Sequence, residues 1–123
     1  MGHGDEIVLA DANFPCVGCP IVIRLDGVAM LDLLPGILEL MPLDPYNPKD
    51  NFALMATTHG DPTPEIWKDY QRVAKEKGDG FETMAQVERY AFYERAKKAH
   101  CVVITGERAV YANIILKKGV VHY

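Results

Sequence analysis

Short apolar segments alternate along this chain with longer segments whose apolar residues recur every three or four positions. The short segments predict buried strands, and the longer ones predict helices with one apolar face. The expected strands cover residues 6–10, 21–25, 52–57, 101–105 and 113–117. Residues 81–87 are ambiguous, and we interpret them as a further strand.

Helix signals lie between these strands. Asp32 is a suitable N-cap, and Pro35 then falls in the first turn, where a missing amide hydrogen costs little. Thr63 followed by Pro64 is a favoured helix start, and Gly78 is a suitable end. We therefore expect one helix after Asp32 and another that ends at Gly78.

A third helix is expected at residues 90–99, where Glu94 and Lys98 are spaced to form an ion pair one turn apart. Strands that alternate with helices predict an α/β fold, with a mixed or mostly parallel sheet flanked by helices. A length of 123 residues is typical of a single domain, so we expect one domain over residues 1–123.

Charge and composition exclude several classes of protein. Thirteen Lys and Arg residues against seventeen Asp and Glu residues give a net charge of −4, without the basic surface that nucleic-acid binding requires. The sequence has no apolar run long enough to span a membrane, and its first residues lack the pattern of a secretory signal. We expect a cytoplasmic protein with neither nucleic acid nor membrane as a partner.

The three cysteines are an odd number in a chain long enough to fold without disulfides. Cys16 and Cys19 form a Cys-x-x-Cys pair, but prolines bracket it in a loop, and a zinc site needs two further ligands. We expect these two residues and Cys101 to be free thiols and the protein to bind no metal. We interpret His59 and His122 as surface residues.

Four side chains are candidates for chemistry. His3 lies between two glycines, and histidine can both accept and donate a proton near neutral pH. Asp11 follows the first expected strand, at the sheet edge where α/β proteins usually bind ligands. Tyr111 and Asn113 offer hydroxyl and amide groups that suit sugar hydroxyls. The simpler interpretations are a flexible terminus for His3, a turn residue for Asp11 and a half-buried strand end for Tyr111.

Four long motifs carry a resemblance to a known family. They are Met-Gly-His-Gly-Asp-Glu-Ile-Val-Leu-Ala-Asp-Ala-Asn-Phe-Pro at residues 1–15, Ile-Arg-Leu-Asp-Gly at 23–27, a segment that begins Glu-Arg-Tyr-Ala-Phe-Tyr-Glu-Arg at 88–99, and one that begins Thr-Gly-Glu-Arg-Ala-Val-Tyr-Ala-Asn at 105–119. In content and order they resemble the L-fucose mutarotase family, relatives of D-ribose pyranase. The resemblance covers nearly the whole chain.

The resemblance implies an isomerase that interconverts the α and β anomers of a free reducing sugar, L-fucose, without a cofactor or a metal ion. His3 matches the family's proton-transferring histidine, and Tyr111 is a second candidate catalytic residue. The family's sugar-binding positions match Asp11, Arg89, Tyr111 and Asn113. Arg89 lies in a segment typical of the fucose branch, whereas the later Tyr-Ala-Asn is the spelling of the ribose branch. We weight the longer segment and expect L-fucose as the substrate.

The spacing of His3 and Asp11 bears on the oligomeric state. A straight strand at residues 6–10 separates them by more than about 15 Å, at about 3.3 Å per residue, whereas one sugar is less than about 8 Å across. Either the glycine-flanked segment folds back, or the pocket combines residues of two subunits. The resemblance implies a ring-shaped homo-oligomer, such as a decamer, with sites near subunit contacts.

Alternatives to this hypothesis stay open: a non-catalytic sugar-sensing module, a structural oligomer, and a mutarotase or pyranase that acts on D-ribose or another monosaccharide. Members of the family also carry a segment, expected to be a helix, before the Gly-His motif. Without that helix we expect exposed apolar surface and a fraying end at His3.

Overall fold

The structure, a computed structural model, describes residues 1–58 and 60–121. The described residues form six strands and three helices. In chain order they are β1 Glu6–Ala10, β2 Val22–Leu25, α1 Met30–Leu40, β3 Phe52–Met55, α2 Ile66–Lys77, β4 Ala85–Val87, α3 Arg89–Lys98, β5 Cys101–Thr105 and β6 Ile114–Lys117.

All six strands join one sheet in the order β2-β5-β1-β6-β3-β4. β5 pairs in parallel with both β1 and β2, and β3 pairs in parallel with β4. β6 is antiparallel to its two neighbours, β1 and β3. The sheet is therefore mixed, and the predicted α/β class is confirmed.

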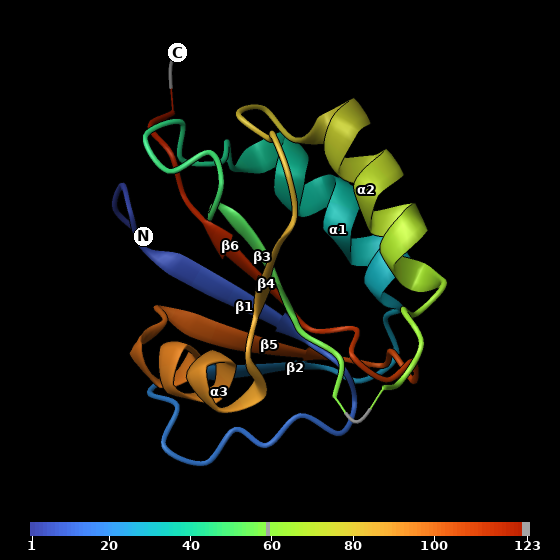
Figure 1. Ribbon diagram of the computed structural model, residues 1–123. Helices are drawn as coiled ribbons and strands as arrows, with labels where there is room; N and C mark the ends of the chain where they lie inside the picture. Colours follow the sequence, from blue (N-terminus) through green and yellow to red (C-terminus); the bar gives the residue numbers. More distant parts are fainter. Residues whose placement is uncertain (59, 122–123) are drawn as a thin grey trace.

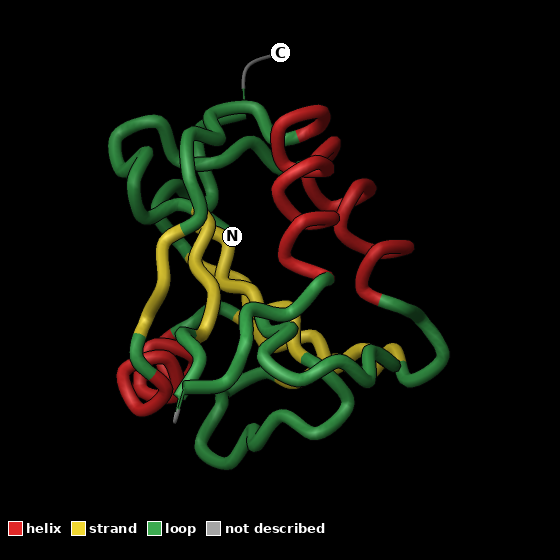
Figure 2. Tube along the Cα trace, turned by 45° about the vertical axis from the view of Figure 1, so that its right-hand side comes forward, coloured by secondary structure: helices red, strands yellow, loops and turns green. Residues whose placement is uncertain are grey.

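The helices cover both faces of this sheet. α1 and α2 lie side by side on one face, and α3 lies alone on the other (Figures 1 and 2). Residues alternate in direction along a strand, so Ile7 and Leu9 pack with α1 and α2, while Val8 and Ala10 pack with α3. This double coverage explains why β1 is an almost continuous apolar run in the sequence.

α1 begins at Met30, so the predicted N-cap at Asp32 is wrong. The amide of Asp32 already donates a hydrogen bond within the first turn. Met30, Leu34 and Leu38 are all buried, and their spacing of four residues carries the apolar face back to the start of the helix. Pro35 consequently lies inside the helix rather than in its first turn.

α2 begins at Ile66, two residues after the predicted Thr63-Pro64 start, and ends before Gly78 as predicted. A Cβ atom at Gly78 would lie 2.6 Å from the carbonyl oxygen of Ala74, which explains why this helix end needs glycine.

α3 begins after Glu88, whose carboxylate accepts hydrogen bonds from the amides of Tyr90 and Ala91. Glu94 pairs with Lys97, at 3.0 Å, instead of the predicted Lys98. Of the segment 81–87, only Ala85–Val87 is a strand. Similarly, β3 ends at Met55, two residues before the predicted end.

Candidate functional site

A pocket of about 720 Å³ opens at the edge of the sheet where β1 and β3 end. Its wall comes from the segments after β1, before α2 and before β6, and from the first turns of α3. The polar residues on this wall are Asp11, Asn13, Asp61, Thr63, Glu65, Arg89, Arg108, Tyr111 and Asn113. Four of the five candidate residues from the sequence thus share one pocket, and His3 does not line it.

Asp11 and Asn113 meet because of the antiparallel register of β1 and β6. Leu9 pairs with Ile114, so the residues that follow β1 face those that precede β6. The amide of Asp11 donates to Oδ1 of Asn113 over 2.7 Å, and the amide of Asn13 donates to Oδ1 of Asp11 over 2.9 Å. Burial raises the pKa of Asp11, although the hydrogen bond from Asn13 opposes this shift. A buried carboxylate of this kind gains from a hydroxyl donor on a ligand.

Tyr111 has a backbone conformation that is rare for a residue with a side chain, with φ of 54°. Two aromatic side chains of α2 donate hydrogen bonds to the backbone of this turn. Nε1 of Trp67 donates to the Tyr111 carbonyl over 2.7 Å, and the hydroxyl of Tyr70 donates to the Ala112 carbonyl over 2.8 Å. Strained backbone of this kind is often found at functional sites.

The hydroxyl of Tyr111 is bound to the segment that precedes α2. It donates to Oδ2 of Asp61 over 2.6 Å and lies 2.9 Å from the hydroxyl of Thr58. The amide of Thr58 also donates to it over 3.3 Å. Tyr111 must therefore exchange one of these partners before its hydroxyl can serve a sugar.

Arg89 begins α3 and brings a positive charge to the pocket. Its guanidinium lies against the ring of Tyr90, 4.8 Å from the ring centre, and Nη2 donates to the Tyr90 hydroxyl over 2.9 Å. That hydrogen bond raises the pKa of Arg89, so the charge persists at every physiological pH. The Nε–H group of Arg89 is buried and has no hydrogen-bond partner among the described residues. Such a donor favours a ligand that can accept from it.

The pocket also has an apolar wall, which the sequence analysis missed. Phe14, Pro15, Met55 and Tyr93 line it, and the rings of Phe14 and Tyr93 meet edge to face at 5.6 Å. Tyr93 lies four residues after Arg89, so both face the same side of α3. This spacing is a signal that could have identified Tyr93 from the sequence.

His3 lies beyond the opposite end of β1 from Asp11, and the segment does not fold back to the pocket. Nε2 of His3 is 3.1 Å from Oδ1 of Asp44, and the amide of Gly4 donates to the Lys118 carbonyl over 2.8 Å. The expected fraying end is therefore wrong for His3, because hydrogen bonds to two distant segments hold it.

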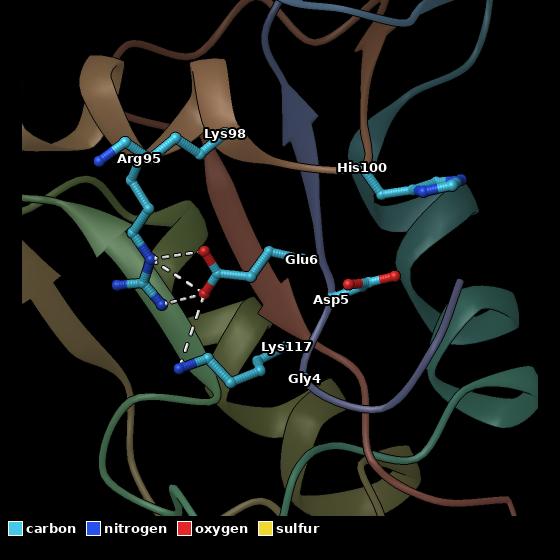
Figure 3. Close-up of a pocket in the computed structure, with 7 residues that line it drawn as sticks. All are labelled: Gly4, Asp5, Glu6, Arg95, Lys98, His100 and Lys117. Carbon is cyan, nitrogen blue, oxygen red and sulfur yellow. Dashed lines mark hydrogen bonds and ion pairs between the residues drawn. The ribbon is translucent and has the colours of Figure 1, made fainter.

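A second pocket, of about 490 Å³, lies at this opposite end of the sheet (Figure 3). Figure 3 shows Arg95 and Lys117 directed at the carboxylate of Glu6. Nε of Arg95 donates to Glu6 over 2.9 Å, and Asp50 accepts from the same guanidinium at 2.9 Å. The charges in this cluster compensate one another, so we assign it a structural role at the start of β1.

The three cysteines are free thiols, as predicted. Burial raises the pKa of both Cys19 and Cys101, which disfavours the thiolate form of each side chain.

In residues 1–58 and 60–121, no group of three or more His, Cys, Asp or Glu side chains could hold a metal ion. The described helices are all too short or too polar to cross a membrane. His59 and His122 lie outside the described residues.

A mixed α/β sheet with a polar pocket at its strand ends defines a small binding protein or enzyme for polar molecules. The chain belongs to the RbsD / FucU transport protein family, whose model matches residues 1–121. It is 51% identical over 130 residues to fucose mutarotase of Danio rerio, covering 98% of this chain and 82% of the relative.

Two solved structures are similar over 99% of the chain. The fucose mutarotase of Streptococcus pneumoniae in complex with L-fucose has a TM-score of 0.93 and 50% identity, with 87% of that chain covered. Bacillus subtilis RbsD complexed with D-ribose has a TM-score of 0.74 and 26% identity, with 87% covered.

Proposed function

We propose that the protein is an L-fucose mutarotase, which interconverts the α and β anomers of the free sugar. The observation that carries this proposal is the joint pocket of Asp11, Arg89, Tyr111 and Asn113 in a chain about half identical to fucose mutarotases. Carboxylate, guanidinium and amide groups match the donors and acceptors of a sugar's hydroxyls. We further propose that residues 1–123 act as one sugar mutarotase domain.

The reaction needs only proton transfer. The O1–H bond breaks, O1 forms a double bond to C1, the bond between C1 and the ring oxygen breaks, and that oxygen receives a proton. C1 then rotates, and the same steps run in reverse on the other face. Because free sugars already do this in water, positioned acid and base groups supply the acceleration that is required.

Each pocket residue has a role in this scheme. Asp11 accepts hydrogen bonds from sugar hydroxyls, while Asn113 and the planar fork of Arg89 donate to sugar oxygens. His3 takes the proton from O1–H and returns it to the ring oxygen. Tyr111 is the second candidate for this proton transfer, in place of His3, with the Asp61 carboxylate as the partner of its hydroxyl.

The distance of His3 from the pocket requires a second copy of the chain. We propose that His3 of one subunit enters the pocket of its neighbour in a ring-shaped homo-oligomer such as a decamer. Edge strand β2 offers surface for subunit contacts, because Val22 and Ile23 are exposed on it and Ile21 is exposed just before it. Among the described residues, no strand pairs with its outer edge.

Two features favour L-fucose over D-ribose. The apolar wall of Phe14, Met55 and Tyr93 suits the methyl group of a 6-deoxy sugar. The chain also shares 50% of its residues with the L-fucose complex against 26% with the D-ribose complex. We place the reaction in the cytoplasm, where three free thiols stay reduced.

Saturation-transfer NMR on L-fucose tests the proposal directly, because it measures exchange between the anomeric C1–H signals. We expect the protein to accelerate this exchange. The alternative is a sugar-sensing module, which the absence of His3 from the pocket favours. Binding of L-fucose without faster exchange would establish that alternative. A protein that neither binds L-fucose nor accelerates its exchange would refute both functions.

A further inference from the structure

Cys16 and Cys19 are two thiols that the proposed reaction does not use, and they lie on one turn between β1 and β2. The amide of Cys19 donates a hydrogen bond to the Cys16 carbonyl over 3.1 Å. Gly18 has φ of 83°, the conformation that glycine supplies at the third position of a type II turn. Cys16 and Cys19 are therefore the first and fourth residues of a tight turn.

This turn brings the two residues within reach of a disulfide. The Cα atoms at the two ends of a β-turn are less than about 7 Å apart, and disulfides usually join Cα atoms that are about 4.4–6.8 Å apart. Both cysteines also pack against the same apolar cluster, on the α3 side of the sheet. Pro15 and Pro20 flank the turn with fixed φ angles, so the segment loses little further freedom when its ends are joined.

The ionisation of Cys19 also shows that the two sulfur atoms lie near each other. Burial raises the pKa of the Cys19 thiol, and the charge of a Cys16 thiolate raises it further. Lys97 acts in the opposite direction. Its side chain lies against the turn, because a Cβ atom at Gly18 would be 3.6 Å from its Cδ and Cε atoms. A cation at this position favours the thiolate that disulfide exchange needs.

Cys101 lies apart from this pair. It is 6% exposed on β5 and packs on the α1 and α2 side of the sheet, the face opposite to Cys16 and Cys19. Val17, in contrast, is 87% exposed at the tip of the turn, and the two cysteines beside it are only partly buried. The three cysteines thus divide into an accessible pair and one protected thiol.

We propose that Cys16 and Cys19 form a redox site, which closes to a disulfide by exchange with a low-molecular-weight disulfide such as oxidised glutathione. The thiolate of one cysteine attacks a sulfur atom of oxidised glutathione, displaces one glutathione thiolate and leaves a mixed disulfide. The thiolate of the other cysteine attacks the protein sulfur of this mixed disulfide and displaces the second glutathione. The pair loses two electrons and two protons, and one oxidised glutathione becomes two reduced molecules. A reducing environment reverses both steps and reopens the pair.

The turn continues directly into the apolar wall of the sugar pocket. Phe14 and Pro15 line this pocket and immediately precede Cys16. The ring of Phe14 meets those of Phe92 and Tyr93 edge to face, with centres 6.0 and 5.6 Å apart. Closing the pair displaces this segment, so we expect sugar binding to weaken by about 3- to 10-fold, the effect of losing about one aromatic contact. This second effect rests on the proposed function, whereas formation of the disulfide does not.

Thiol counting tests the redox site without any sugar. The parent protein is equilibrated in glutathione buffers of increasing oxidised fraction, quenched with acid, denatured and alkylated. Reduced chains carry three labels, and we expect oxidised chains to carry a single label, which peptide mapping places on Cys101. Cys101→Ala is the matched control and should close the pair in the same buffers. Cys16→Ser should instead stop at a mixed disulfide between Cys19 and glutathione.

Three results would overturn the redox site. The parent could keep all three thiols in these buffers, it could accumulate mixed disulfides that never close, or its disulfide could involve Cys101 or a second chain. Peptide mapping of the parent distinguishes these results even if the Cys101→Ala chain does not fold.

Titration with L-fucose then measures the effect on the pocket. The reduced parent should bind the sugar about 3- to 10-fold more tightly than the closed parent. A chain with both Cys16→Ser and Cys19→Ser should bind equally in reducing and oxidising buffer. Equal affinity of the reduced and closed parent would overturn the effect on the pocket. A reduced parent that binds no L-fucose refutes the proposed function instead, and the thiol counts still decide the redox site.

Discussion

The amide of Asp11 donates to the side-chain oxygen of Asn113 over 2.7 Å and joins the end of β1 to the start of β6. Both residues are buried, at 9% and 4% exposure, yet both line the pocket. The same pair therefore closes the sheet edge and forms the polar floor of the site, so stability and sugar binding are coupled there.

Replacement of Asn113 tests this coupling. Asn113→Ala leaves the buried amide of Asp11 without its acceptor. We therefore expect the free energy of unfolding to fall by about 1–3 kcal/mol and sugar binding to weaken. Urea unfolding and titration with L-fucose measure the two effects. Asn13→Ala is the control, because it removes a pocket amide but keeps the backbone bond to Asp11. Equal stability of the two variants would contradict the structural role of Asn113.

Asp11→Asn should have opposite effects on stability and binding. Burial raises the folded-state pKa of Asp11 above 3.8, so the ionised form costs stability as the pH rises through that raised value. Removing the charge should therefore stabilise the fold at pH 7, with no gain below about pH 3.8. The KM for L-fucose should rise by about 10- to 100-fold, because a charged acceptor is lost. Thermal unfolding at both pH values checks the sign, and a gain that is equal at both would contradict it.

The sequence predicted most accurately the strands that are buried on both faces of the sheet. β1, β5 and β6 were located to within a residue because their continuous apolar runs are buried on both faces. The predicted cap at Asp32 failed because the apolar face of α1 extends back to Met30, and tertiary packing outweighed the local capping preference.

The contacts that shape the site were beyond local reasoning. Trp67 and Tyr70 support the turn at Tyr111 from another layer of the fold, and Asp44 reaches His3 across 41 residues. The sequence indicated Asp11 and Asn113 as site residues, but their hydrogen bond follows from the antiparallel register of β1 and β6. Such pairings depend on strand order, which periodicity does not determine.

Arg89 should contribute mainly to sugar binding. Arg89→Lys keeps the charge but loses the planar fork and the buried Nε–H donor, so we expect KM for L-fucose to rise by about 10-fold or more with a smaller change in kcat. Arg72→Ala, which removes an exposed arginine of α2, serves as the control.

The parent enzyme should exchange L-fucose faster than D-ribose in the same NMR assay. Equal rates for the two sugars would move the protein to the ribose branch.

The sharpest prediction concerns His3, which we propose enters the pocket of a neighbouring subunit. His3→Ala should lower catalysed exchange by about 10²–10⁴-fold while sugar binding persists, because proton transfer then falls to water. Light scattering must show that the variant keeps the parent's oligomeric state. Full activity in an intact His3→Ala assembly would transfer the catalytic role to Tyr111 or Asp11.

Mixed oligomers then show whether His3 acts on its own pocket or on its neighbour's. His3→Ala and Arg89→Ala chains are unfolded together and refolded, and exchange is measured at low L-fucose. If His3 reaches the neighbouring pocket, some sites combine an intact His3 with an intact Arg89, and activity exceeds the average of the two variants. If each chain serves its own pocket, every site carries one defect, and mixing gives only the average. As a control, mixing the parent with a chain that carries both substitutions should lower activity below simple dilution only in the shared arrangement.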